Sequence, residues 1–438
     1  MTGLTVESTP LRDVSAVAEF ARRCFDPAPG DQVGVELEFL VFDRTSPTAH
    51  VPLARFERLV PGLPGGSKVT FEPGGQLELS GPPAALPEAL NRMAADVAAV
   101  RDALGAAGLA LGGVGLDPVR PARRQLRLPR YDAMAEFLGR PYGSLMMCST
   151  ASVQVNLDLG ERPAVRWERA HALGPMLMAA FANSPLSGGR PCGWMSGRQA
   201  VWNRLDLTRT APVPVTGDPA ADWAEYLLDA RLMLVREPEE RCRPVRDGST
   251  FRDWLAGGGG GGHGGRRPTA DDLAYHATTL FPPVRPRGWL EIRYLDAQHP
   301  AAWPVCVAVT HALITDDRAA DAAMAAVAAA EPLTDPDNGL YREPPGPMAG
   351  RTTDPYPGAW EVAARCGLAD PRLRRAAEAG FRAALEALPR LGADAALVAE
   401  VAAFADRHVT TGRSPAADLM DPTPGPRVPA WLNDEGRQ

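Results

Sequence analysis

The sequence predicts an α+β fold in which helices pack on one face of a curved, mainly antiparallel sheet and the other face is open. Three observations lead to this class. Short segments alternate polar and apolar residues with period two, longer segments have helical periodicity, and the last third of the chain is rich in alanine. The polar positions of the alternating segments hold acids, amides and arginines, so we expect the open face to carry the chemistry.

The predicted elements follow one another as this class requires. Helical periodicity predicts helices at residues 11–25, 51–60, 84–107, 131–138, 164–182, 222–234, 271–280, 301–331 and 371–407. Alternation predicts strands at residues 34–43, 76–79, 109–116, 149–159 and 289–295. Pro73, Gly74 and Gly75 are turn formers ahead of the second strand, and Gly108 is a C-cap for the long helix before it. Helices and strands are therefore expected to share one core.

No internal repeat and no clean linker divides the chain, so we predict a single domain over residues 1–438. Its sheet-forming core is expected at about 31–300 and its helical C-terminal part at about 301–412, with a loose, proline-rich tail at 413–438. The glycine-rich run at 257–265 is interpreted as a flexible linker, with a mobile lid as the alternative.

The composition narrows the possible classes of protein. The net charge is −7, which argues against nucleic acid as a partner. No apolar stretch is long enough to cross a membrane, and the N-terminus has no secretory signal. The six cysteines are scattered without a CxxC pair, which favours reduced thiols. We therefore expect a cytoplasmic protein without membrane association.

Lys68 is the only lysine, and this limits how the chain can handle phosphate. Residues 65–68, GGSK, do not form the GxxxxGK[ST] motif of a P-loop. A Schiff-base lysine is nearly excluded for the same reason. A nucleotide phosphate would have to be bound through metal ions and arginines.

Four segments carry polar residues at a spacing of two. The pairs are Glu36/Glu38, Gln76/Glu78, Gln154/Asn156 and Glu291/Arg293. Glu72, just before the turn, is expected to lean toward the same face. One such pair would be ordinary surface, but four pairs on apolar strands predict a metal-binding floor, because clustered carboxylates repel one another unless cations neutralise them. Oxygen ligands suit two or three Mg²⁺ ions, or Mn²⁺, and the histidines show no metal-ligand spacing.

The segment at 196–210, SGRQAVWNRLDLTRT, is too polar to be core throughout. Arg198 and Arg209 in this segment either clamp a carboxylate or phosphate or pair with a surface acid. Trp202 is also a candidate ligand contact, although a tryptophan taken alone is more often a packing residue.

Five segments occur in the order found in plant-type glutamate–cysteine ligases. They are GVELEFL, FEPGGQLELSGPP, STASVQVNLD, FANSPLSGGRPCGWMSGRQAVW and HATTLFPPVRPRGWLEIRYLDAQHP. The sequence thus resembles this family of carboxylate–amine ligases from about Gly34 to Leu313. The resemblance implies a glutamine-synthetase-like catalytic sheet. It is nearest to a bacterial branch that makes γ-glutamylcysteine for ergothioneine.

The resemblance also implies a reaction and a set of roles. ATP phosphorylates the γ-carboxylate of L-glutamate, and the amine of L-cysteine attacks the acyl phosphate to give γ-glutamylcysteine, ADP and phosphate. The implied metal ligands are Glu36, Glu38, Glu78 and Glu291, with Glu72 and Gln76 completing that shell or touching substrate. The implied substrate and nucleotide contacts are Gln154, Asn156 and Arg198. Trp202 and Arg209 are added as candidate contacts from the polar segment alone. Arg293 and Arg198 are the expected catalytic arginines, acting by position and charge.

Two alternatives stay open at this point. The first is a γ-glutamyl ligase with an amine acceptor other than cysteine. The second is a non-catalytic regulator that binds glutamate or nucleotide on the same scaffold. In each case the expected partners are small molecules, and the chain is expected to be a monomer or a small homo-oligomer.

Overall fold

The sheet at the centre of the molecule is organised around its longest strand. The computed structural model describes residues 10–27, 30–239, 241–257, 266–330 and 358–421. Within them, seven strands form one antiparallel sheet in the order β10-β11-β5-β1-β3-β2, and β4 pairs with the end of β1. The strands are β1 (Val33–Asp43), β2 (Lys68–Phe71), β3 (Leu77–Ser80), β4 (Leu109–Gly112), β5 (Ser152–Leu157), β10 (Val284–Pro286) and β11 (Leu290–Asp296). Because β1 pairs with three other strands, its register fixes theirs.

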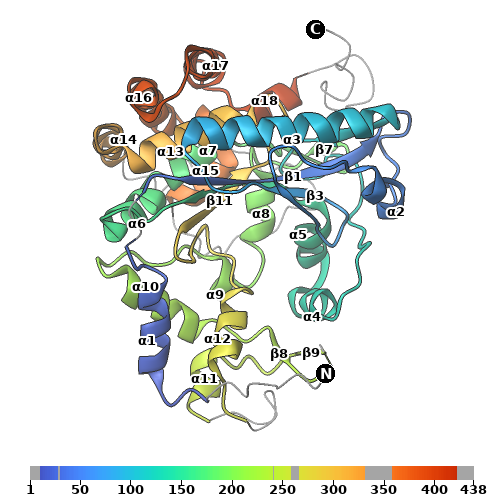
Figure 1. Cartoon of the computed structure of the whole chain (residues 1–438), viewed down its shortest axis with the longest axis vertical. Helices are drawn as coiled ribbons and strands as arrows, with labels where there is room; N and C mark the ends of the chain where they lie inside the picture. The colour runs from blue at the N-terminus through green and yellow to red at the C-terminus, as the bar shows by residue number, and fades with distance from the viewer. Residues whose placement is uncertain (1–9, 28–29, 240, 258–265, 331–357, 422–438) are drawn as a thin grey trace.

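Helices lie on both sides of this sheet (Figure 1). The helices of the first half are α1 (Val14–Arg23), α2 (Leu53–Phe56), α3 (Leu86–Ala106), α4 (Pro129–Leu138), α5 (Ser144–Ser149), α6 (Pro163–Ala172), α7 (Gly174–Ala180), α8 (Gly197–Trp202) and α9 (Leu207–Thr210). Those of the second half are α10 (Pro219–Asp229), α11 (Phe251–Leu255), α12 (Ala270–Ala277), α13 (Trp303–Thr315), α14 (Asp317–Ala330), α15 (Ala359–Cys366), α16 (Pro371–Ala387), α17 (Ala395–Phe404) and α18 (Pro415–Met420). Figure 1 shows α3, α7 and α13 on one side of the sheet, and α5 and α8 on the other.

The alternation in β1 decides which side chains meet those helices. Val35, Leu37 and Phe39 are buried, at most 2% exposed, and belong to the hydrophobic core, whereas Glu36 and Glu38 are partly exposed. The helix α13 packs against β5 and is apolar on all sides, as expected for a helix enclosed by other elements. The prediction of an α+β fold with one open sheet face is therefore confirmed.

A further set of elements lies beyond the open face. It contains α1, α10, α11 and α12 together with two short strands, β8 (Leu234–Arg236) and β9 (Cys242–Pro244) (Figure 1). Another short pair, β6 (Leu186–Ser187) and β7 (Arg190–Pro191), precedes α8. In Figure 1 these elements lie on the same side of the sheet as α5 and α8.

Several predicted boundaries need correction. The helix expected at 222–234 ends at Asp229, because the apolar run that follows is extended and buried in β8. The helix expected at 164–182 is two helices that meet at Gly174. The expected loose tail is wrong at its start, since residues 415–420 form α18 and bury Ala416. The glycine run at 258–265 lies outside the described residues.

Two observations concern membrane-spanning helices and the state of the cysteines. No helix in the described part of the chain is long and apolar enough to cross a membrane. All six cysteines are free thiols, and four of them are buried.

Candidate active site

Strand register brings the acids of neighbouring strands together on the open face. Glu38 of β1 lies directly opposite Glu78 of β3, and Glu36 lies opposite Gln154 of β5. Residues directly opposite in an antiparallel pair point to the same face, with Cβ atoms only about 5 Å apart. The convergence expected from the spacing is therefore present in the structure.

The next strand of the sheet, β11, extends the polar face. Glu291 lies opposite Asn156 of β5, and Arg293 follows two residues later on the same face. The Arg293 Nη1 atom donates to Gln154 Oε1 at 2.6 Å. The polar pairs of β1, β3, β5 and β11 thus form one continuous surface.

The turn between β2 and β3 places Glu72 at the edge of this surface. Gly75 has a φ of +87°, in the left-handed region that favours glycine, and its N–H donates to the Glu72 carbonyl at 2.7 Å. A side chain at Gly74 would collide with the backbone of Cys148 in α5. The two glycines therefore let the turn pack closely on α5 and hold Glu72 near Glu38.

Gln76 has a different position from the one predicted. It is 2% exposed, and its amide donates to the Thr150 carbonyl at 2.9 Å and accepts from the Gly74 N–H at 3.0 Å. Both ends of the side chain are thus bonded to backbone. The Gln76 side chain therefore joins the turn to the segment after α5. In this position it differs from the predicted contact with metal or substrate.

Four of the acids, Glu36, Glu38, Glu72 and Glu78, form what we call the acid cluster. Burial, followed by the charges of Glu38 and Glu78, raises the pKa of Glu72 to about 8. Burial and the charge of Glu78 raise the pKa of Glu38 to about 7. The pKa of Glu36 is also raised, by burial and then by Glu291 and Glu78. Such shifts mean that the cluster lacks sufficient positive charge.

Neutral hydrogen bonds orient the carboxylates of this cluster. Glu38 accepts from the Ser152 backbone N–H at 2.8 Å and from Gln154 Nε2 at 3.2 Å. Glu36 accepts from Asn156 Nδ2 at 3.0 Å. Gln154 and Asn156 therefore position the acids next to them, and they add no charge that would neutralise the cluster.

The acid cluster fits a hard divalent cation in ligand type and in charge. Its donors are all carboxylate oxygens, which suit Mg²⁺ or Mn²⁺. A bound cation would also reverse the raised pKa values, because it favours the ionised carboxylates. As the side chains stand, no three acid, histidine or cysteine groups among the described residues are close enough to ligate one ion together. Binding would therefore require the carboxylates to turn toward the ion.

Glu291, predicted as a metal ligand, lies among three arginines. It is 1% exposed, and its carboxylate accepts from Arg285 Nε at 2.6 Å, Arg293 Nη1 at 3.0 Å and Arg287 Nη1 at 3.1 Å. Burial by itself would raise the pKa of Glu291, but Arg285 and Arg293 outweigh it and hold that pKa well below its usual range. The carboxylate is already neutralised by arginine, so its charge serves to position the guanidinium groups.

Arg198, Trp202 and Arg293 line one small hollow between α8 and residues 281–283. Arg198 is 3% exposed and its Nη2 atom donates to the Arg293 carbonyl at 2.8 Å. The Trp202 ring lies 5.5 Å from the Arg198 guanidinium. The Trp202 Nε1 and Arg293 Nε atoms are buried and have no hydrogen-bond partner among the described residues. Unpaired buried donors beside an arginine suit an anionic group such as a carboxylate.

Arg209 is not part of this hollow. It is fully buried, and its guanidinium donates to Asp206 at 3.2 Å and to the backbone carbonyls of Thr279 at 2.8 Å and Arg231 at 2.6 Å. All three of its nitrogens are therefore in use. Of the two roles considered for Arg209, the structure supports pairing with an acid and not a clamp on substrate.

Sequence reasoning missed four residues beside the site. Arg285 and Arg287 contact Glu291. Arg285 does so because the short strand β10 pairs it with Glu291, and β10 was not predicted from the sequence. Arg130 and Tyr131 lie near the turn: the Arg130 charge lowers the pKa of Glu72, and burial together with Glu72 raises the pKa of Tyr131 to about 12. These two residues stand at the start of α4, where the sequence predicted only a helix at 131–138.

Comparison with known proteins identifies the family of this chain. The model of glutamate–cysteine ligase family 2 matches residues 32–428. The chain belongs to this family. It is 40% identical to the glutamate–cysteine ligase EgtA of Mycobacterium tuberculosis over 429 residues, which cover 95% of this chain and 91% of that protein. It is 35% identical to the chloroplastic glutamate–cysteine ligase of Medicago truncatula, over 53% of this chain and 47% of that protein.

A solved structure of a glutamate–cysteine ligase from Francisella tularensis in complex with AMP is also similar. It has a TM-score of 0.44 and 11% identity over 90% of this chain and 85% of that chain. These values are too low for any inference about the site. Membership of glutamate–cysteine ligase family 2 therefore rests on the family model and on the two relatives.

Proposed function

We propose that the protein catalyses the ATP-dependent ligation of the γ-carboxylate of L-glutamate to the amine of L-cysteine, with γ-glutamylcysteine, ADP and phosphate as products. Family membership and the names of the two relatives point to this reaction. The observation that supports it most is the acid cluster, because under-neutralised carboxylates lie on the same sheet face as the Arg198–Trp202 hollow.

In the first step a γ-carboxylate oxygen of glutamate attacks the γ-phosphorus of ATP, and ADP leaves. Mg²⁺ held by Glu36, Glu38, Glu72 and Glu78 would neutralise charge on the phosphates. Arg198, with the unpaired Trp202 N–H beside it, is suited to the α-carboxylate of glutamate. The glutamate side chain would then extend over Arg293 toward the acid cluster.

In the second step the amine of cysteine attacks the acyl phosphate carbon, loses a proton, and phosphate leaves. No side chain has to act as a nucleophile, so the task of the protein is to hold the reactants and to balance charge. Arg293 is fixed for this by Gln154 on one side and Glu291 on the other. We further propose that the reaction occurs in the cytoplasm and that its product enters ergothioneine biosynthesis.

The test is an assay of phosphate release from ATP with glutamate and a panel of amines, with each product identified by mass. We expect release to depend on Mg²⁺ and to be fastest with cysteine, and the product to have the mass of γ-glutamylcysteine. Faster turnover with another amine would support the alternative acceptor. Tight ATP binding without turnover in the presence of Mg²⁺ would support the non-catalytic regulator.

A further inference from the structure

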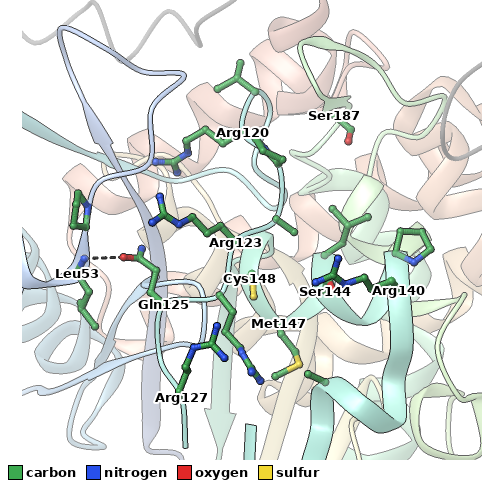
Figure 2. Close-up of a pocket in the computed structure, with 18 of the residues that line it drawn as sticks. Leu53, Arg120, Arg123, Gln125, Arg127, Arg140, Ser144, Met147, Cys148 and Ser187 are labelled. Carbon is green, nitrogen blue, oxygen red and sulfur yellow. Dashed lines mark hydrogen bonds between the residues drawn. The ribbon is translucent and has the colours of Figure 1, made fainter. Parts of the chain in front are cut away.

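A second cavity lies next to the turn that holds Glu72, and it shares no lining residue with the Arg198–Trp202 hollow. It has a volume of about 1380 Å³, is open to solvent, and is lined by residues within 52–57, 119–127 and 140–148, together with Ser187 and Gly188 (Figure 2). Small-molecule sites commonly have volumes of ~300–1,000 Å³, so this cavity has room for a ligand of nucleotide size. None of the residues of the acid cluster lines it.

Arginine dominates the charge of this cavity. The lining arginines are Arg120, Arg123, Arg124, Arg127 and Arg140. The single acid in the lining is Glu57. This concentration of positive charge stands in a chain whose net charge is −7, so it is a local feature and not a general property of the surface.

The five arginines differ in whether their charge is already used. Arg120 is buried and pairs with Asp117 at 2.7 Å, and Arg124 pairs with Asp132 at 2.5 Å. Arg123, Arg127 and Arg140 are exposed and form no side-chain hydrogen bond or ion pair with the described residues. These three form what we call the free arginine set.

The free arginine set faces the cavity from two sides. In Figure 2, Arg123 and Arg127 come from the loop on the left of the cavity, and Arg140 comes from the helical segment on its right. Leu53, Ala122 and Met147 add apolar surface to the wall. Guanidinium groups bind phosphate and carboxylate through paired N–H donors, and arginines on two sides suit a ligand with more than one such group.

We infer that this cavity binds a small molecule that carries two or more phosphate or carboxylate groups, held by Arg123, Arg127 and Arg140. The binding part of this inference does not depend on the proposed reaction, whereas the effect on rate described below rests on it. The free arginine set supplies the charge, and the apolar wall accommodates the body of the ligand.

The cavity is connected to the acid cluster through Gln125. The backbone N–H groups of Gln125 and Leu126 donate to the Pro73 carbonyl at 2.7 and 3.0 Å. The Gln125 side chain donates to the Gly74 carbonyl at 2.8 Å and accepts from the Leu53 N–H at 2.8 Å. A ligand that fixes the loop at 119–127 therefore acts on the turn that positions Glu72, which makes the cavity an effector site.

The test uses the full chain and two probes, inorganic tripolyphosphate and citrate, which separate phosphate from carboxylate as the preferred group. Binding is measured by isothermal titration calorimetry without metal. We expect at least one probe to bind, and the triple variant Arg123→Ala/Arg127→Ala/Arg140→Ala to weaken it by at least about tenfold, since each lost contact is a hydrogen bond to a charged group. The affinity should fall with added salt.

A matched control removes the same charge elsewhere. The control is the triple variant Arg318→Ala/Arg375→Ala/Arg382→Ala. These arginines lie on α14 and α16, are exposed, and form no side-chain hydrogen bond or ion pair with described residues. This control should bind the probe like the wild type, and circular dichroism confirms that both triple variants fold. If one fails to fold, the single variants Arg123→Ala and Arg127→Ala give the same comparison.

Three results would overturn the assignment. They are the absence of binding by both probes, equal affinity in the wild type and the cavity variant, and loss of binding in Arg198→Ala with retention in the cavity variant. The last result would place the probe in the Arg198–Trp202 hollow.

The effect of the bound probe on the rate of phosphate release is measured at constant free Mg²⁺, and we expect the probe to change the rate of the wild type by at least about twofold. A change of the same size in the cavity variant would also contradict the proposal.

Discussion

Two groups of acids on the same sheet face have opposite electrostatic surroundings. Glu291 is enclosed by three arginines, and its pKa lies well below the usual range. Glu38 and Glu72 form no ion pair with a described residue, and their pKa values are raised by burial and by neighbouring carboxylates. Glutamates at equal spacing on strands thus have two kinds of surroundings, because Glu291 is neutralised by arginines whereas Glu38 and Glu72 have no ion-pair partner among the described residues.

The largest expected effect comes from Glu291→Gln. This change leaves Arg285, Arg287 and Arg293 around a neutral group, and removing one partner of a buried ion pair costs about 3–5 kcal/mol of unfolding free energy. Urea denaturation without metal measures the loss. Glu38→Gln, on the same face, is the matched control and should leave the stability unchanged or slightly higher. Equal losses in both variants would contradict the comparison.

The next largest effect is expected for Glu78→Gln. The substitution removes one negative charge from the acid cluster and little volume, so the fold should persist while Mg²⁺ is held less well. We expect turnover to fall by about 100- to 1,000-fold, the range found when one group that stabilises a transition state is lost. Steady-state kinetics over a range of Mg²⁺ concentrations, with a melting curve as the control for folding, checks this. Normal turnover would remove Glu78 from the metal site.

The stability of the metal-free protein should depend on pH in a defined direction. The folded-state pKa values of Glu38 and Glu72, about 7 and about 8, lie above the ordinary glutamate value of about 4.3. Ionising them in the folded protein is therefore unfavourable, and stability should fall between about pH 4 and pH 8 by an amount on the order of a few kcal/mol.

Adding Mg²⁺ should reduce this dependence of stability on pH. Melting temperatures recorded between pH 5 and pH 9 should decline without Mg²⁺ and decline much less with it, because the cation stabilises the ionised carboxylates. A decline of the same size under both conditions would show that Mg²⁺ does not reach the acid cluster.

The smallest expected effect is that of Arg198→Lys. Lysine keeps the charge but cannot provide two parallel N–H donors to a carboxylate. We expect the KM for glutamate to rise about tenfold, equivalent to about 1.4 kcal/mol, with a smaller change in kcat. Initial rates at varied glutamate and saturating ATP measure both constants. An unchanged KM would show that the carboxylate of glutamate binds elsewhere.

Much of the sheet could be predicted because its signal is local. In GVELEFLVF the apolar residues must all point to the core, so the face of Glu36 and Glu38 is fixed by their neighbours in the sequence. The face of Glu78 follows in the same way. The convergence of these acids then needs only that the strands pair.

What could not be predicted depends on contacts between distant segments. The role of Glu291 is decided by Arg285 and Arg287, which lie in a short segment without clear alternation. Gln76 matches the alternation of its strand, but the tight turn directs its amide to the backbone of Thr150. Arg209 is buried by α4 and by residues near 279. These contacts come from distant segments, so the polar segment around Arg209 does not predict them.

The register of β1 has a consequence for how preparations of this enzyme are judged. A shift of one residue would send Glu36 and Glu38 into the apolar interior and put Val35 and Leu37 on the polar face. A misaligned chain would thus be unable to fold, so the arrangement that folds is the one competent for chemistry. Low specific activity in a well-folded sample should accordingly be sought in its metal content before its conformation.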